Sequence, residues 1–362
     1  MVCPETHPSL SNRLLVVVLI AAFLSIVSGC NKASNVTKEV AYVNAPQVFL
    51  RDRLATIYEK KGTVKLGEKV YILDRERRFT FVRNERGEEG WLADRYLTSS
   101  EVYDQLQKLA ADNAKAPVQA RGIARTTLNL HVTPGRDTDH LFQLKEGEKV
   151  DVLKRATAEK PARLQPSRPA VSKSQDGKDQ TPPPPALEDW SLVRNSSGQA
   201  GWVLGRMIDV DIPLEVAQYA EGQRIVSSFV LNQVKDGDKN VPQYLVVLTD
   251  NKDGLPWDYN QIRVFSWNLA RHRYETAYRE RNLYGVFPVK AGTEDFGKEG
   301  VLPVFTLKIK NMDGSETERK YRMIGPIVRR VATPEELKAE AAERAARKAA
   351  EPPKKSGRKS RP

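Results

Sequence analysis

Alternating apolar and polar residues recur in short stretches along most of the chain between positions 39 and 331. This alternation is typical of half-buried β-strands, whose successive side chains point to opposite faces of a sheet. Turn signals at Asp236-Gly237-Asp238 and Asp313-Gly314 interrupt the pattern in the C-terminal part. There the pattern predicts seven or eight strands, of which seven can be placed: 225–234, 244–249, 262–267, 274–278, 283–289, 304–309 and 320–324. The pattern therefore predicts an all-β protein.

Comparing the chain with itself reveals an internal repeat. Gly67-Glu68-Lys69-Val70 returns 80 residues later as Gly147-Glu148-Lys149-Val150, and Gly90-Trp91 returns 111 residues later as Gly201-Trp202. The growth of the offset places an insertion inside the second copy. Residues 155–186 contain seven prolines and mostly polar side chains, too little apolar surface to offset the entropy of ordering. We predict a disordered insertion over 155–186.

The two copies resemble the bacterial SH3-like (SH3b) domain. The second copy has the opening Leu128-Asn129-Leu130-His131, the Gly-Glu-Lys-Val turn and strand at 147–150, and the ending over 190–203. The first copy departs from the family pattern, with Phe79 in place of a tryptophan. The resemblance implies two small SH3-like barrels, at 39–98 and 118–212. Such modules bind peptidoglycan peptides in some proteins and only pack or mediate protein contacts in others.

Four aromatic residues are the candidate ligand-binding positions of these two barrels. The candidate cleft lies around Phe79, Trp91, Trp190 and Trp202. The alternative is that these rings belong to the cores of the barrels, because large aromatic side chains supply much of the buried surface of small domains.

A linker helix is expected at 99–117, between the two copies. Thr98 and Glu101 have the spacing of a capping box, and Val102, Leu106 and Leu109 form one apolar stripe. Pro117 is expected to end the helix. The stripe favours packing against a barrel over the binding of a partner.

The third domain, 213–331, is expected to be a β-sandwich or a barrel. Both faces of the strand Ile262–Trp267 carry bulky side chains, which predicts a central strand. The aromatic residues of this domain are expected in its core, with solvated arginines on the outer face. The alternative is a concave surface for a glycan, a peptide or an anionic polymer. The acidic residues around Asp250 and Asp253 lack the spacing of an EF-hand and are expected to be turn residues.

The N-terminus has the features of an export signal. Residues 14–26 form an apolar run that is too short to cross a bilayer, and Val27-Ser28-Gly29-Cys30 follows it. This stretch resembles a bacterial lipobox, which implies a signal peptide at 1–29, cleavage between Gly29 and Cys30, and a diacylglycerol on Cys30. Residues 30–38 would be a tether. The resemblance favours an outer-membrane lipoprotein facing the periplasm; the alternative is an uncleaved anchor helix.

Few side chains are available for catalysis. The chain has two cysteines and four histidines, and Cys30 alone would remain as a lipidated cysteine after cleavage. Cysteine peptidases need a cysteine paired with histidine, and zinc amidases need clustered ligands. We expect no enzyme activity, no cofactor and no metal. The expected function is a non-catalytic envelope protein that binds peptidoglycan or envelope proteins. The alternatives are an interaction subunit without cell-wall affinity and, more remotely, a cell-wall hydrolase.

The net charge of +12 is concentrated in two segments. The insertion carries six basic and three acidic residues, and residues 329–362 carry eleven basic and five acidic residues. Thr333 and Pro334 predict the start of a marginal helix, and residues 332–362 end as a basic tail. Because the folded domains are nearly balanced in charge, we expect no nucleic-acid partner. The tail is expected to contact an anionic surface or to have no partner.

Overall fold

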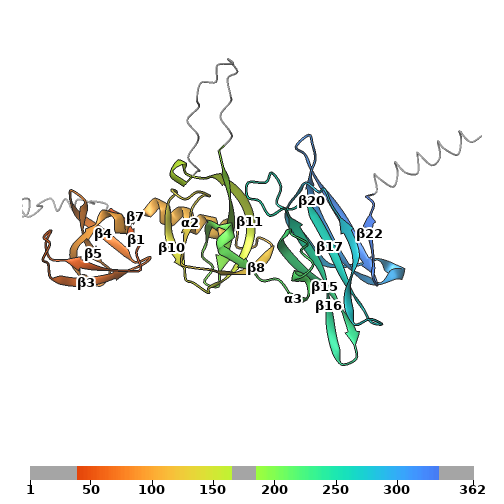
Figure 1. Ribbon diagram of the computed structural model, residues 1–362. Helices are drawn as coiled ribbons and strands as arrows, with labels where there is room; N and C mark the ends of the chain where they lie inside the picture. Colours follow the sequence, from red (N-terminus) through yellow and green to blue (C-terminus); the bar gives the residue numbers. More distant parts are fainter. Residues whose placement is uncertain (1–38, 165–184, 334–362) are drawn as a thin grey trace, which may run out of the picture.

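The computed structural model describes residues 39–164 and 185–333. Three β-rich units follow one another in a row, with the C-terminal unit at the far end from the first (Figure 1). The proposed signal peptide, Cys30, the tether, most of the insertion and nearly all of the basic tail lie outside the described residues. The prediction of an all-β protein is confirmed by the described residues, which contain two α-helices and 22 strands.

The first domain is a seven-stranded sheet in the order β3-β2-β6-β5-β4-β1-β7. Its core contains Leu50, Val64, Val70, Val82 and Leu92, which are fully buried. Its elements are β1 (Val40–Val43), β2 (Gln47–Arg51), β3 (Lys60–Lys65), β4 (Lys69–Glu76), β5 (Phe79–Asn84), β6 (Glu89–Ala93), the 3₁₀ turn η1 (Asp94–Tyr96) and β7 (Leu97–Ser99).

The second domain repeats this topology strand for strand, in the order β10-β9-β13-β12-β11-β8-β14. The predicted repeat is therefore a repeat of structure. Leu130, Leu144, Val193 and Val203 occupy its core. Its elements are β8 (Ala120–Ala124), β9 (Leu128–His131), β10 (His140–Leu144), β11 (Lys149–Glu159), η2 (Ala162–Leu164), β12 (Leu187–Asn195), β13 (Ala200–Leu204), η3 (Gly205–Met207) and β14 (Ile208–Val210).

The repeated Gly-Trp pair has a steric explanation. A Cβ on Gly90 would lie 2.8 Å from the Leu50 Cβ, and one on Gly201 would lie 2.6 Å from the Leu130 Cβ. In both domains the glycine therefore lets a core leucine of one strand pack directly over the backbone of its neighbour. The tryptophan that follows points to the opposite face of the strand.

The predicted start of the disordered insertion, at residue 155, is wrong. Residues 155–159 belong to β11 and pair with residues 187–191 in β12, and Ala162–Leu164 form a 3₁₀ turn. The two strands extend the hairpin beyond the length that the first domain uses. Arg155 is ordered because it pairs with buried acceptors, which a reading of composition could not reveal.

The linker helix is α2, Ser100–Asp112, which is shorter than the expected 99–117 and ends before Pro117. Its N-cap residue is Ser99, so the capping position expected at Thr98 is off by one residue. The apolar stripe packs against Leu141 of the second domain. Tyr103 also stacks on Tyr42 of the first domain, with ring centroids 4.0 Å apart. The stripe therefore packs against a domain, as predicted, and the helix also contacts the other domain, which the stripe did not predict.

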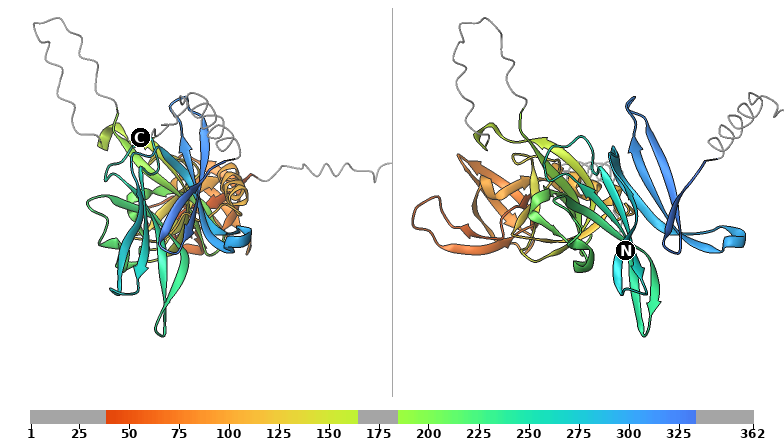
Figure 2. Two further views of the ribbon diagram at one scale, coloured as in Figure 1. Left: turned by 90° about the vertical axis from the view of Figure 1, so that its right-hand side faces the viewer. Right: turned by 45° about the vertical axis from the view of Figure 1, so that its right-hand side comes forward.

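The C-terminal domain is a sandwich of two four-stranded antiparallel sheets (Figure 2). Leu245, Val264, Phe305 and Met323 lie in the core between the sheets. One sheet contains β15 (Arg224–Asp236), β16 (Lys239–Thr249), β17 (Gln261–Asn268) and β18 (Arg273–Glu280); the other contains β19 (Gly285–Asp295), β20 (Val301–Lys310), β21 (Glu316–Ile324) and β22 (Ile327–Val331). The short helix α3 (Leu214–Ala217) precedes the first sheet and η4 (Gly297–Glu299) precedes β20.

The seven placed strands of this domain are all present, and each is longer than predicted, but the strand predicted from 283 begins only at Gly285. The strand β22 was not placed. The prediction that Ile262–Trp267 is central is confirmed, because β17 has a neighbour on each side. Arg263 differs from the expected solvated arginines: it is buried and donates to the Tyr219 carbonyl and the Thr276 hydroxyl, both at 3.0 Å.

A buried ion-pair network connects the second domain to the sandwich. Asp189 of β12, whose side chain is 6% exposed, accepts hydrogen bonds from Arg155 at 2.5 Å, from Arg224 at 2.8 Å and from the Gly254 amide at 2.8 Å. Arg155 also donates to the Trp257 carbonyl at 2.8 Å. Burial by itself raises the pKa of Asp189, but these hydrogen bonds outweigh it and hold the pKa below its ordinary value. We call Arg155, Asp189 and Arg224 the domain clasp.

Candidate functional site

The four predicted aromatic positions do not form one cleft. Phe79 and Trp91 lie on the first domain, and Trp190 and Trp202 lie on the second. Within each domain the members sit on neighbouring antiparallel strands, β5 and β6 or β12 and β13. Their environments differ between the two domains, even though the strand order is the same.

In the first domain the aromatic positions lie half-exposed on the outer face of the sheet. Phe81 opposes Trp91 across β5 and β6, with ring centroids 5.1 Å apart. Arg51 of β2 opposes Trp91 from the other side. The Arg51 guanidinium lies 4.3 Å from the centroid of the Tyr58 ring and 5.4 Å from that of Phe79. One cation therefore holds together aromatic rings from a strand and from the β2–β3 loop.

The surface continues to the edge of the sheet. Phe49 precedes Arg51 by two residues and so lies on the same face of β2. The Lys60 ammonium lies 3.9 Å from the centroid of its ring. Ile57, at the end of the β2–β3 loop, is 87% exposed. We call this surface the aromatic face; its members are Phe49, Arg51, Tyr58, Lys60, Phe79, Phe81 and Trp91.

The corresponding face of the second domain is largely covered. Trp190, the counterpart of Phe79, is 3% exposed, and Leu192, the counterpart of Phe81, is also buried. His131 packs edge-on against Trp190, with ring centroids 5.3 Å apart. Trp202, the counterpart of Trp91, stays half-exposed. The core interpretation therefore applies to Trp190, and the surface interpretation applies to Phe79 and Trp91.

The surroundings of His131 favour the uncharged form of its ring. Its Nδ1 lies 3.1 Å from the Thr138 carbonyl oxygen and 3.0 Å from the Thr138 hydroxyl. Burial lowers the pKa of His131, and the neighbouring His140 lowers it further. The ring therefore serves as an uncharged packing surface for Trp190 near neutral pH.

The aromatic face offers binding chemistry. Half-exposed rings present apolar surfaces that can stack on a sugar or on a peptide side chain. Arg51 and Lys60 supply positive charge at the same surface. Among residues 39–164 and 185–333, no group of three or more His, Cys, Asp or Glu side chains is placed to hold a metal ion. In the same ranges, no helix is long and apolar enough to cross a membrane.

Sequence reasoning found two members of this face and missed the others. Phe49 and Arg51 alternate with the partly buried Val48 and the buried Leu50 in a short strand, so the alternation alone could have placed them on one face. Their contact with β6 could not be read from the chain, because it depends on the strand order. Tyr58 lies in a loop without periodicity, and no sequence signal pointed to it.

No protein-family model matches the chain, and no curated protein matches it. Solved structures that match include NlpC2 from Trichomonas vaginalis, with 9% identity, 67% of this chain and 97% of the other covered, and a TM-score of 0.16. NlpC1 from the same organism has 11% identity, 69% and 95% coverage, and a TM-score of 0.16. An NlpC/P60 family protein from Bacillus cereus ATCC 10987 has 10% identity, 82% and 95% coverage, and a TM-score of 0.21. At these identities and TM-scores, the matches assign neither a family nor an activity to the chain.

Proposed function

We propose that the protein is a non-catalytic lipoprotein of the bacterial cell envelope that binds peptidoglycan through the aromatic face of its first domain. The observation that carries the proposal is the half-exposed row of Phe79, Phe81 and Trp91, held beside the Arg51 guanidinium. A purely structural row would be expected to be covered, as Trp190 is in the second domain.

The chemistry of this surface suits a cell-wall ligand. Sugar rings present C–H groups that pack on aromatic faces, and the peptide stems of peptidoglycan carry carboxylates that basic side chains attract. Arg51 and Lys60 lie within the same surface. The expected lipid on Cys30 would hold the domain close to a membrane, and the first domain follows the lipid by fewer than ten residues.

The non-catalytic part of the proposal rests on the contacts that His131 and His272 make and on the position of the cysteines. His131 packs on Trp190, and the Nδ1 of His272 lies 2.7 Å from an Asp236 carboxylate oxygen on the surface. Both cysteines of the chain precede the first domain. A nucleophilic cysteine paired with a histidine within the described residues is therefore excluded by the sequence.

Cosedimentation with purified, insoluble peptidoglycan tests the proposal. The chain from Asn31 to Pro362 retains every described residue and lacks the lipidated cysteine. We expect it to sediment at low and at moderate salt, and Trp91→Ala to weaken the binding by about tenfold, since one aromatic contact contributes on the order of 1 kcal/mol. Trp202→Ala is the matched control, because it changes the equivalent position of the second domain.

Three other outcomes would change the assignment. Sedimentation that disappears at higher salt equally in all variants would point to the basic segments alone. Absence of sedimentation at low salt would favour an interaction subunit of an envelope assembly. Release of soluble cell-wall fragments would favour a hydrolase. The anchor is tested separately: the full chain should partition into detergent, and Cys30→Ser should not.

A further inference from the structure

One row of side chains crosses five strands of the first domain on its outer face. Asp74 of β4 lies opposite Phe81 of β5, which lies opposite Trp91 of β6. Trp91 lies opposite Arg51 of β2, which lies opposite Lys60 of β3 at the edge of the sheet. Directly opposed residues point to the same face, so the row runs from a carboxylate over two rings to a guanidinium and an ammonium. We call these five residues the dipolar row.

The acidic end of the dipolar row is exposed and carries a second carboxylate beside the first. Glu76 follows Asp74 by two residues, so both carboxylates share one face of β4. Arg75, between them, opposes the buried Thr80; it therefore points to the other face, where it pairs with Glu39. Among the residues that the structure describes, no cation pairs with Asp74 or Glu76. Their negative charge is therefore available to a ligand.

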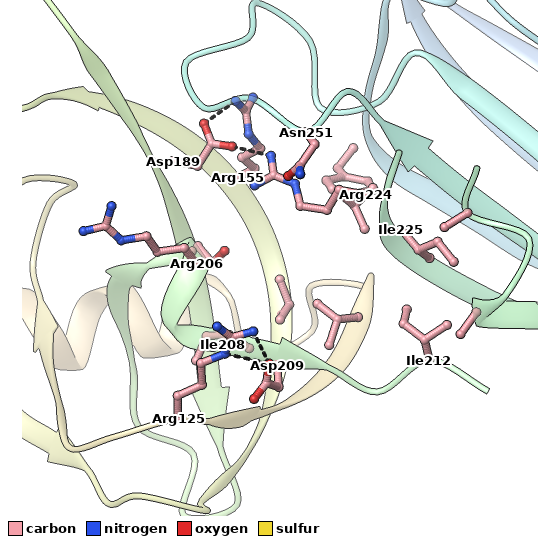
Figure 3. A pocket seen from close by; sticks show the side chains of 18 residues that line it. Arg125, Arg155, Asp189, Arg206, Ile208, Asp209, Ile212, Arg224, Ile225 and Asn251 are labelled. Carbon is pink, nitrogen blue, oxygen red and sulfur yellow. Dashed lines mark hydrogen bonds and ion pairs between the residues drawn. The ribbon is translucent and has the colours of Figure 1, made fainter. Parts of the chain in front are cut away.

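The basic end of the dipolar row has aromatic rings as neighbours of its cations. The Arg51 guanidinium lies 4.3 Å from the centroid of Tyr58, and the Lys60 ammonium lies 3.9 Å from that of Phe49. A ring attracts a cation without cancelling its charge, so both groups can still attract a carboxylate. The guanidinium groups of the domain clasp differ, because they meet at Asp189 and are already paired with carboxylates (Figure 3).

The middle of the dipolar row is uncharged. The rings of Phe81 and Trp91 lie 5.1 Å apart. The next outward residues of the same two strands, Arg83 and Glu89, oppose and neutralise each other, with an ion-pair distance of 2.6 Å. Neighbouring strands are about 4.8 Å apart, so the acidic end and Arg51 are separated by roughly 14 Å along the sheet. The row therefore presents two opposite charges with apolar rings between them.

The second domain has an equivalent row with a different charge pattern. Lys154 stands at the place of Asp74, and Ala156 stands at the place of Glu76. At the other end, two histidines stand at the places of the two cations, and burial lowers the pKa of one of them, His131. Both domains have the same strand order, so folding does not require the charges of the first domain.

We propose that the dipolar row selects the peptide part of peptidoglycan, as an extended peptide with its ammonium toward Asp74 and Glu76 and its carboxylate toward Arg51 and Lys60. This inference rests on the proposed function, because it names the part of peptidoglycan that the aromatic face binds. A neutral glycan strand would gain nothing from either charged end. A purely anionic polymer would be repelled by the acidic end.

The length of such a peptide fits the row. An extended residue spans about 3.3–3.6 Å, so about four residues reach from the acidic end to Arg51. A diamino acid in the peptide supplies the ammonium, and the C-terminus supplies the carboxylate. The apolar part between them lies on the rings of Phe81 and Trp91.

Acetylation of the free amines of insoluble peptidoglycan separates this inference from the proposed function. The protein is again the chain from Asn31 to Pro362. It should bind unmodified peptidoglycan about fivefold more tightly than acetylated peptidoglycan, because an exposed ion pair contributes up to about 1 kcal/mol. Equal binding to both materials would overturn the inference and leave the proposed function intact. Binding to neither would overturn both.

Two variants assign the ends of the row. The soluble probe is the tripeptide acetyl-Lys-Ala-Ala, whose ammonium is blocked by a second acetylation and whose carboxylate is blocked by amidation. In Asp74→Asn, acetylation of the probe should no longer weaken binding, whereas amidation still should. Lys60→Gln should show the reverse. The matched controls are Asp112→Asn, at the exposed end of α2, and Lys61→Gln, the next residue of β3.

Tryptophan indole NMR signals locate the bound probe and report folding. The chain has five tryptophans, so five indole N–H signals are expected. The signal of Trp91 should shift with the probe and give its dissociation constant, while that of Trp202, at the equivalent position, should stay. Unchanged signals of the other tryptophans establish that each variant is folded. The inference is overturned if the Trp91 signal does not shift, if blocking either charge leaves the affinity unchanged, or if the two variants show exchanged effects.

Discussion

Replacement of Asp189 by asparagine tests the domain clasp most directly. The substitution preserves the size of the side chain and removes its charge. One of the two oxygens becomes an amide NH₂, which faces a guanidinium donor in place of an acceptor. The Asp189 carboxylate accepts from Arg155, Arg224 and the Gly254 amide, so at least one of these contacts is lost and the others weaken.

The expected loss of interface stability depends on which hydrogen bonds Arg155 and Arg224 keep in the variant. A hydrogen bond to a charged group contributes about 1.5–3 kcal/mol, and breaking a buried ion pair costs about 3–5 kcal/mol. Arg155 keeps the carbonyls of Leu255 and Trp257, and Arg224 keeps Asp253. Neither arginine becomes completely unpaired, so we expect a loss near the lower limit, about 3 kcal/mol. The lowered pKa of Asp189 indicates that the charged side chain stabilises the folded state, because its pairing outweighs the burial of its charge.

Hydrogen exchange measured by mass spectrometry reports this loss locally. The Gly254 amide donates to Asp189, and the Val289 amide donates to Gln119 of the second domain at 2.8 Å. Both bonds cross the interface. A loss of about 3 kcal/mol should accelerate exchange in peptides that contain these amides by roughly a hundredfold.

The control is Asp209→Asn, the same chemical change in an exposed pair. The side chains of Asp209 and Arg125 are 57% and 55% exposed, and such pairs contribute about 0–1 kcal/mol. Unchanged exchange at Gly254 and Val289 in the Asp189→Asn variant would refute the reasoning. Equal acceleration in all three domains would also refute it, because it would mean that the substitution destabilises the whole folded chain and not the interface in particular.

Three further predictions concern packing within and between the domains. Gly285→Ala places a Cβ 2.1 Å from a ring carbon of the buried Tyr259; we expect urea denaturation to show a loss of about 3 kcal/mol, whereas Gly292→Ala on the same strand, with open space around it, should cost less than about 1 kcal/mol. The pKa of His131 is lowered in the folded state, so on acidification the unfolded chain takes up a proton at this histidine before the folded chain does. The contribution of His131 to thermal stability should therefore be fully present above pH 6.5 and fall as the pH drops below it. An unchanged melting temperature of the second domain between pH 7.5 and 5.5 would contradict this. Tyr103→Ala removes the ring that stacks on the first domain; small-angle scattering should then show a larger radius of gyration, and an unchanged radius would mean that the stack does not hold the two domains together.

Much of the fold could be predicted because it depends on local constraints. The glycines that recur at Gly90 and Gly201 occupy equivalent positions where a core leucine crosses the backbone, so the motif survives when the surrounding sequence changes. Gly67 and Gly147 both adopt a φ of 78°, which a side chain rarely adopts. Sterically required residues such as these mark a repeat even where strands differ.

The strand limits were less predictable, because a strand's partners decide where it ends. Ile327–Val331 forms β22 although Arg329 and Arg330 interrupt its apolar pattern. It pairs with β21, from Lys320 to Ile324, so backbone hydrogen bonds with a neighbour complete it. In the same way, Arg155–Glu159 continues β11 because β12 lies opposite.

By itself, the sequence determined the all-β class, the duplicated unit, the linker helix and the composition of each strand face. Only the tertiary structure decided which of those faces stay accessible: Phe79 remains at the surface, whereas Trp190, at the matching position, lies buried beside His131. It also decided that Asp189 meets Arg224 across the interface. The physical reason is that side-chain alternation depends on neighbouring residues, whereas burial and charge pairing depend on which distant segment packs against them.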